Sequence, residues 1–210
     1  MFKKRSVTVK RMRVADDDDD SDDTTSVTRR GTAIYFAADV SKKSVRELSE
    51  LLDEAQQCCW ETWNRVDKPR ITLFIHSSGG CVHAGMRAHE LIRRCPLPVV
   101  TIGEGLVASS ATLLHLAGNL RLIAPSTHVL IHQLRSSADG THSELRDEIL
   151  NNKMLMKRLR DIYLQTTKLP EKKLDKLLKR ELELNTDAAL KYGVADGLIT
   201  SDGIKLVGEE

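Results

Sequence analysis

The sequence contains few aromatic residues and no long apolar run. Phe, Trp and Tyr make up 4% of the 210 residues, and no stretch of eighteen consecutive apolar residues occurs. Because a helix needs about 20 apolar residues to cross a bilayer, we exclude a transmembrane helix. Residues 1–14 also lack the apolar segment of a secretory signal. We therefore predict a cytoplasmic protein that does not act at a membrane.

Several motifs with known chemistry are also missing. The four cysteines are Cys58, Cys59, Cys81 and Cys95, and they form neither a CxxC pair nor zinc-type spacing. Reduced thiols and no metal site are therefore expected. The sequence has no GxGxxG, GxxxxGK[ST] or GxSxG motif where its glycines and serines cluster. Dinucleotide-binding, phosphate-loop and hydrolase-elbow interpretations are thus unsupported.

Charge is nearly balanced over the whole chain but not along it. The 32 basic and 30 acidic side chains leave a net charge of +2, which argues against a nucleic-acid binder. Residues 1–15 carry six basic side chains and no acid, whereas residues 16–23 carry seven aspartates and no base. Blocks of like charge repel themselves and bury nothing. We predict a disordered tail over residues 1–30, with order beginning near Gly31.

From residue 31 the sequence alternates between two kinds of segment. Short β-branched or apolar runs predict strands at residues 32–36, 71–75, 99–102, 121–124 and 128–132. Apolar residues spaced three and four apart predict helices at residues 41–57, 84–94 and 108–117, with a glycine turn at residues 103–105. Such alternation is typical of an α/β layered fold with right-handed crossover connections.

The character changes after residue 141. Thr141 and Glu144 form a capping-box pattern, and the apolar residues behind it predict one long helix over about residues 141–167. A shorter helix follows Pro170, a last short helix covers residues 186–192, and residues 194–200 end in a strand. We expect a flexible C-terminal tail over residues 201–210.

Two glycine-containing segments could carry chemistry. Gly79 and Gly80 follow a buried strand, where backbone N–H groups could approach and stabilise an oxyanion. Ser109 follows another buried strand at the start of a predicted helix, a suitable place for a nucleophile. A tight turn and a helix-capping serine explain the same two patterns without any catalysis.

A serine nucleophile needs a base and a third group that orients it. Of the seven histidines, His132 ends an apolar strand and is well placed to project into a cleft. The pattern does not choose among the downstream acids. These are Asp147, Asp161, Asp175, Glu181, Glu183, Asp187 and Asp196.

Four segments together resemble the proteolytic subunits of the Clp proteases, the ClpP family. They are residues 75–86 (IHSSGGCVHAGM), 105–110 (GLVASS), 121–133 (RLIAPSTHVLIHQ) and 192–196 (YGVAD). Their order and spacing agree with the family across about residues 32–200. The resemblance implies a ClpP/crotonase-like layered α/β fold of repeated units, in which the helix at about 141–167 is a protruding handle, within a peptidase domain at 31–200.

The resemblance also implies residue roles. Ser109 matches the nucleophile and His132 the general base, while Gly80 and Ser110 match the positions whose N–H groups form the oxyanion hole. Counting back eleven residues from Tyr192 places the acid at Glu181, where the family has aspartate.

Several positions depart from the family pattern. Ser78 and Leu134 stand in place of family prolines, and Ser110 stands in place of methionine. The charged tail does not resemble the family segment that gates the pore and meets the ATPase. These departures bear on ATPase partnership more than on chemistry.

The implied function is proteolysis inside an oligomeric chamber. The resemblance implies two stacked seven-membered rings of this chain, a tetradecamer, that cut unfolded proteins. No cofactor is implied, since ATP is used by a partner AAA+ unfoldase. Three alternatives stay open: a catalytically inactive ring subunit, a phage head-maturation protease on the same fold, and an acyl-CoA enzyme of the crotonase superfamily.

Overall fold

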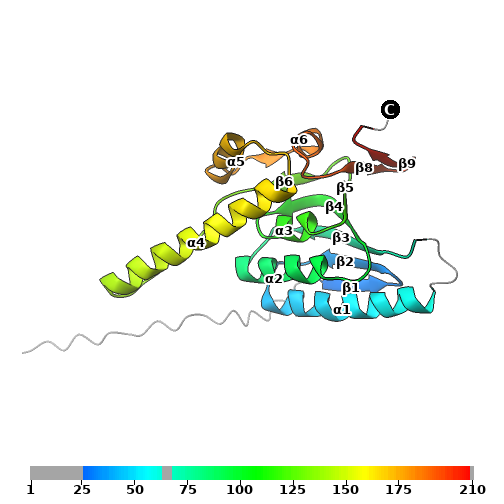
Figure 1. Cartoon of the computed structure of the whole chain (residues 1–210), viewed down its shortest axis with the longest axis horizontal. Helices are drawn as coiled ribbons and strands as arrows, with labels where there is room; N and C mark the ends of the chain where they lie inside the picture. The colour runs from blue at the N-terminus through cyan, green and yellow to red at the C-terminus, as the bar shows by residue number, and fades with distance from the viewer. Residues whose placement is uncertain (1–25, 63–67, 209–210) are drawn as a thin grey trace, which may run out of the picture.

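The computed structural model describes residues 26–62 and 68–208, and its main feature is a mixed β-sheet (Figure 1). The strands run in the order β1-β2-β3-β4-β5-β8-β9, and β6 pairs with both β4 and β7. Their bounds are β1 (Ser26–Arg30), β2 (Ala33–Ala37), β3 (Ile71–Ser77), β4 (Val99–Ala108), β5 (Leu120–Ile123), β6 (His128–Leu130), β7 (Glu183–Leu184), β8 (Gly197–Thr200) and β9 (Gly203–Leu206).

The middle of this sheet is parallel. Strands β2, β3, β4, β5 and β8 all pair in parallel, whereas β1 and β9 pair antiparallel with β2 and β8. Helices α1 (Lys42–Glu61), α2 (Val82–Arg93) and α3 (Ala111–Leu116) each connect two successive parallel strands. Parallel neighbours require such crossovers. The predicted layered α/β fold is confirmed.

Strand β4 is longer than predicted and divides the sheet. Its first half, Val100–Gly103, pairs with β5, and its second half, Leu106–Ala108, pairs with β6. A turn was predicted at residues 103–105, but the strand continues through it and only shifts its register against β3. Gly105 has φ +60, a conformation that glycine adopts without strain, and this lets the strand bend rather than end.

Two helices begin where their capping residues predict. Ser41 accepts a hydrogen bond from the Ser44 N–H at 3.0 Å and starts α1. Thr141 and Glu144 form the predicted capping box of α4 (His142–Thr166). Helix α4 protrudes from the rest of the domain, as expected for the handle (Figure 1). The helices α5 (Glu171–Leu178) and α6 (Thr186–Lys191) follow it.

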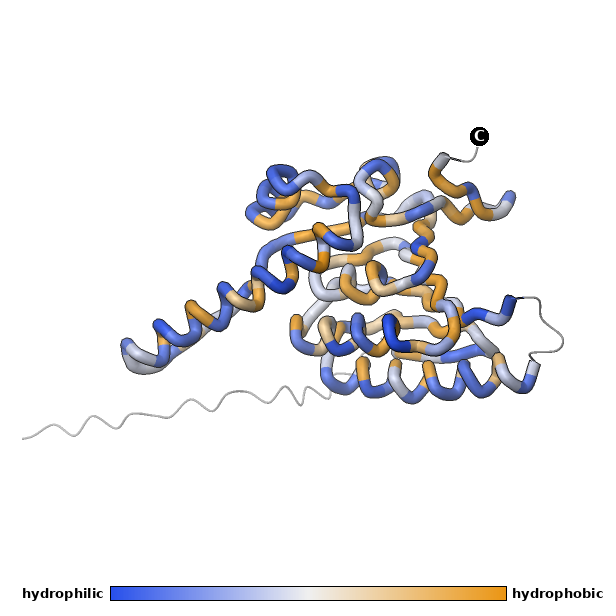
Figure 2. Tube along the Cα trace, viewed as in Figure 1, coloured by the Kyte–Doolittle hydropathy of each residue, from blue (hydrophilic) through white to orange (hydrophobic). Residues whose placement is uncertain are grey.

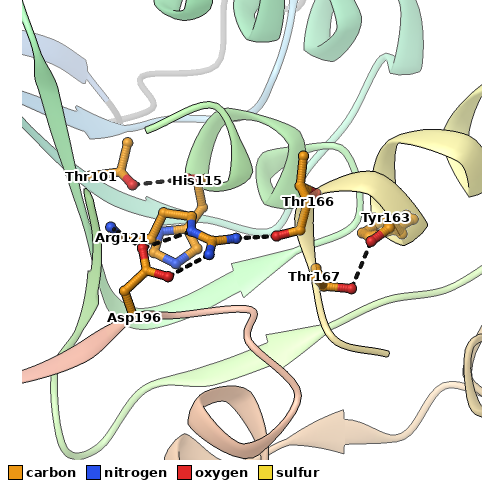
Figure 3. Close-up of polar contacts among 7 residues, drawn as sticks. All are labelled: Thr101, His115, Arg121, Tyr163, Thr166, Thr167 and Asp196. Atoms are coloured by element: carbon orange, nitrogen blue, oxygen red, sulfur yellow. Dashed lines mark hydrogen bonds and ion pairs between the residues drawn. The ribbon is translucent and has the colours of Figure 1, made fainter. Parts of the chain in front are cut away.

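The end of α4 is fixed to the sheet by a charged cluster (Figure 3). The Arg121 Nε donates to the Asp196 carboxylate at 2.9 Å, and a second guanidinium nitrogen of Arg121 forms an ion pair with the same group. Arg121 also donates to the Thr166 carbonyl. The cluster therefore ties β5, the start of β8 and the last turn of α4 together.

The core lies between the sheet and the inner faces of the helices. Figure 2 shows hydrophobic residues alternating with polar ones along α1, as its amphipathic spacing predicts. Fully buried members include Phe36, Leu48, Ile75 and Leu114. Among the described residues, no helix is long and apolar enough to cross a membrane.

The predicted domain boundaries need two corrections. Strand β1 lies inside the predicted disordered tail, so residues 26–30 are ordered and not part of that tail. Strand β9 lies inside the predicted C-terminal tail. Both segments are ordered because they pair with a neighbouring strand. The residues of the segment alone do not show that such a partner exists, so the strand could not be predicted from them. The predictions for residues 1–25 fall outside the described residues.

Candidate active site

Three strand ends bring the predicted site residues to one edge of the sheet. Strands β3 and β6 each pair in parallel with β4, so the carboxyl ends of all three strands point the same way. Gly80 follows β3, Ser109 follows β4 directly, and His132 lies two residues beyond β6. Ligand sites of parallel sheets commonly form at this edge. The topology thus assembles residues that are up to 52 positions apart in the chain.

Ser109 occupies a sharp turn between β4 and α3. Its φ of +53 is unusual for a residue with a side chain. The turn is held by the Ser109 N–H, which donates to the Leu130 carbonyl at 2.8 Å. The Thr112 N–H and hydroxyl donate to the Ser109 carbonyl at 3.1 and 2.6 Å. The helix begins at Ala111, later than predicted, so Ser109 lies in the turn itself.

The glycine pair is required by the close approach of this turn and of Val40. At Gly79 an added Cβ would lie 2.6 Å from the Ser109 Cβ, and φ is +101. At Gly80 it would lie 2.5 Å from the Val40 carbonyl oxygen, with φ +141. Each position therefore excludes any side chain.

The backbone N–H groups of Gly80 and Ser110 have no acceptor within the described part of the chain. Both residues line the same cavity of about 510 Å³ as Ser109 and His132. Ser110 is buried, where an N–H group normally finds a partner, whereas Gly80 is exposed to the cavity. Two donors without a partner, beside a serine in a tight turn, can bind a developing oxyanion.

His132 is half-buried on the wall of this cavity. Burial lowers the pKa of its imidazole, the Gln133 backbone acts in the opposite direction, and the Arg135 guanidinium lowers it further. A neutral imidazole at physiological pH is the state that a general base needs. No hydrogen bond joins Ser109 to His132 in the described ranges. Such bonds are often long until a substrate is bound.

Glu181 lies near His132, just beyond the pairing of β6 with β7. Val129 pairs with Leu184 and Leu130 with Glu183, the ladder ends there, and the Gln133 N–H then donates to the Leu178 carbonyl at 2.8 Å. His132 and Glu181 line a second, small cavity of about 80 Å³. The Glu181 carboxylate is nevertheless ion-paired with Arg135, and no bond joins it to His132 among the residues described.

Most other candidate acids are engaged elsewhere. Asp196 binds Arg121, Asp175 binds Arg160, Glu183 binds His128, and Asp161 binds Lys157. Neither of the two cavities that His132 lines contains any of these carboxylates. Glu181 is therefore the candidate acid with the best placement.

No metal-binding cluster of three or more His, Cys, Asp or Glu side chains occurs in the described ranges. The four cysteines are free thiols. Cys81 is exposed and lines the larger cavity beside Gly80. The absence of a cofactor stays a prediction.

The structure also shows contacts that the sequence motifs did not indicate. The Tyr163 hydroxyl is hydrogen-bonded to the Thr112 hydroxyl, which in turn donates to the Ser109 carbonyl. Arg135 contacts Glu181 from a segment without regular structure. No local pattern marks these residues, because each partner comes from a distant part of the chain.

Comparison with known proteins points to one family. Residues 31–202 match the family model described as Clp protease. The ATP-dependent Clp protease proteolytic subunit of Deinococcus radiodurans is 32% identical over 142 residues, which cover 67% of this chain and 70% of that protein. The corresponding subunit of Paracoccus denitrificans is 29% identical over 178 residues, 84% of this chain and 85% of that one.

A solved structure shares the fold. A mutant ClpP1 from Listeria monocytogenes matches with a TM-score of 0.71 and 24% identity, and the match covers 83% of this chain and 95% of that one. The family match extends from β2 to the β8–β9 turn and includes every residue of the candidate site. With sequence and fold in agreement over this length, the chain belongs to the Clp protease family.

Proposed function

We propose that this chain is a serine endopeptidase in which Ser109 is the nucleophile and His132 the general base. His132 takes the Ser109 proton as the serine oxygen attacks a peptide carbonyl. The N–H groups of Gly80 and Ser110 stabilise the tetrahedral oxyanion, and water then releases the acyl group. The observation that carries this proposal is the meeting in one cavity of a serine, a histidine and two N–H groups that have no acceptor in the described part of the chain.

Glu181 is proposed as the third member of the triad. A carboxylate opposite His132 can accept its second N–H and stabilise the imidazolium formed during the reaction. The small cavity that His132 and Glu181 share supports this choice over the other acids. Glutamate is one methylene longer than the family aspartate, so it reaches the imidazole from a different backbone position.

The proposed substrate is an unfolded polypeptide, cut inside rings of this chain. The relatives are named as ATP-dependent proteolytic subunits, and we extend their assembly to this protein as two stacked seven-membered rings. The exposed apolar residues of α4, which include Ile149, Leu150 and Met154, support burial between subunits. ATP would be used by a partner AAA+ unfoldase in the cytoplasm. The proposed peptide hydrolysis at Ser109 needs no cofactor.

One observation favours a second candidate, a catalytically inactive ring subunit. No hydrogen bond links Ser109, His132 and Glu181 into a chain within the described residues, and Arg135 holds the proposed acid. An inactive subunit would keep the fold and the handle but would not react at Ser109.

Labelling with a fluorophosphonate separates the two candidates. We expect the wild-type chain to be labelled and to cleave a fluorogenic peptide, and Ser109→Ala to lose both properties by a factor of about 10³ or more. Ser78→Ala is the matched control, because Ser78 lines the same cavity but its hydroxyl donates to the Asp39 carboxylate at 2.6 Å. It should keep both properties. An unlabelled wild-type chain would instead support the inactive subunit.

A further inference from the structure

Arg135 connects the proposed base and the proposed acid. Its guanidinium is ion-paired with the Glu181 carboxylate, and its side chain lines both the large cavity with Ser109 and the small cavity between His132 and Glu181. Arg135 lies only three residues beyond His132 in an irregular segment, so its backbone keeps the cation close to the imidazole. Arg135 is therefore bonded to the carboxylate that His132 would need as its hydrogen-bond acceptor in a triad.

The geometry sets up a competition for one carboxylate. His132 and Glu181 line the same small cavity, where a triad needs the acid. A guanidinium is a stronger partner for a carboxylate than a neutral imidazole is, because its full charge strengthens the hydrogen bond. Among the described residues Arg135 binds the Oε1 atom of Glu181, and no hydrogen bond orients the imidazole of His132 toward that carboxylate.

We propose that Arg135 is a positioning residue that withholds Glu181 from His132 and so keeps the catalytic triad in a low-activity arrangement. The inference rests on the proposed function, since it assigns a regulatory contact to the same site. Side-chain exposures of 72% for Arg135 and 58% for Glu181 weaken the pair, so its effect on activity should be a few-fold rather than complete. Removing the cation should release Glu181 to His132.

The charges around His132 predict in which direction its pKa moves when Arg135 is removed. Arg135 opposes protonation of His132, in addition to the effect of burial. Without the guanidinium, His132 loses a nearby cation and gains a nearby carboxylate, and both changes favour the imidazolium. Other groups with titratable or charged side chains line the two cavities around His132. They are Cys81 and His83 from α2, Glu148 and Tyr163 from α4, and Lys179 and Arg180 from the segment after α5.

The test measures the pH dependence of kcat/KM for peptide cleavage. In Arg135→Gln we expect the acidic midpoint to move to higher pH by about one unit and the plateau to rise by roughly threefold or more, because Glu181 can then orient the imidazole. In Arg135→Gln combined with Glu181→Gln the gain in plateau should disappear. Lys179→Gln is the matched control, since it removes a cation from the same small cavity but not the ion pair.

A second readout does not depend on activity. The NMR titration of the His132 Cε1 proton, assigned with His132→Asn, should show the same upward shift in Arg135→Gln and a smaller one in the double variant. An unchanged midpoint, or a lower plateau in Arg135→Gln, overturns the proposal. If no variant shows Ser109-dependent cleavage but the NMR shift appears, the contact stands and the proposed peptidase function fails instead.

Discussion

His115 is a fully buried titratable residue. It is 1% exposed, and neither ring nitrogen makes a well-formed hydrogen bond to another described residue, although the Val194 backbone lies close by. Burial lowers the pKa of the imidazole from 6.5 to about 4, and Arg121 lowers it as well, while Asp196 and the Val194 backbone act in the opposite direction. Figure 3 shows His115 beside the Arg121–Asp196 pair. The folded protein therefore holds His115 neutral.

This neutral histidine makes stability depend on pH. The unfolded chain binds a proton at His115 near pH 6.5 but the folded chain only near pH 4, so the contribution is complete above pH 6.5 and is lost as pH falls toward 4. The total loss should be roughly 3 kcal/mol. His115→Leu should remove most of this loss in denaturant unfolding at fixed subunit concentration. The exposed His142→Gln should not, and an equal loss in His115→Leu would contradict the assignment.

The backbone and the side chain of Ser110 have different predicted roles at the site. Its hydroxyl is buried and has no hydrogen-bond partner among the described residues, whereas its N–H is a proposed oxyanion donor. Ser110→Ala should raise the free energy of unfolding by about 1 kcal/mol, because it removes an unsatisfied polar group. Peptide cleavage should stay within about twofold of wild type. A large loss of kcat would show that the hydroxyl itself contributes to the reaction.

At the scale of elements, α4 supports the turn that presents Ser109. Tyr163 in α4 is 3% exposed and is hydrogen-bonded to Thr112 in α3, whose hydroxyl donates to the Ser109 carbonyl. Burial raises the pKa of Tyr163 to about 12, so it stays a neutral donor. The handle helix and the proposed nucleophile are thereby connected through two hydroxyl groups.

Tyr163→Phe tests this connection. The change keeps the ring but removes the hydroxyl, so the free energy of unfolding should fall by about 1 kcal/mol. We also expect kcat to fall several-fold with little change in KM, because the Ser109 turn loses support. Tyr192→Phe removes the hydroxyl of a less buried tyrosine and serves as the control. Equal effects on kcat in both variants would argue against a role for the Thr112 contact.

At the scale of the whole molecule, the protruding part of α4 carries apolar residues that the single chain does not cover. Ile149 is 55% exposed and Met154 is 65% exposed. A helix that extends from the domain with such residues gains stability when a second subunit buries them. The proposed stacking of two rings provides that burial.

A pair of charges on the protruding part of α4 should separate the rings. Ile149→Lys combined with Met154→Lys replaces two apolar contacts by buried cations, so native mass spectrometry should find half the wild-type assembly mass. Asn151→Lys adds a cation at an exposed polar position of the same helix and should leave the mass unchanged. An intact wild-type mass in the double variant would place the ring contact elsewhere.

Local patterns predicted most helices and the buried strands. Capping residues such as Ser41 and Thr141 contact groups three positions away, and apolar periodicity is also a short-range property. The motifs around Gly80, Ser109 and His132 likewise lie in continuous segments. These features were readable because their physical causes involve neighbours in the chain.

The short strands β1, β7 and β9 and the division of β4 were not predicted, since strand pairing depends on a partner that lies elsewhere in the chain. The same reason explains which features of the site could be predicted from the sequence and which could not. The sequence by itself determined the helices, the buried strands and the residues that could carry the chemistry. Only the tertiary structure decided that Tyr163 supports the Ser109 turn and that Arg135 binds Glu181, because side chains far apart in the chain meet only once the sheet has formed.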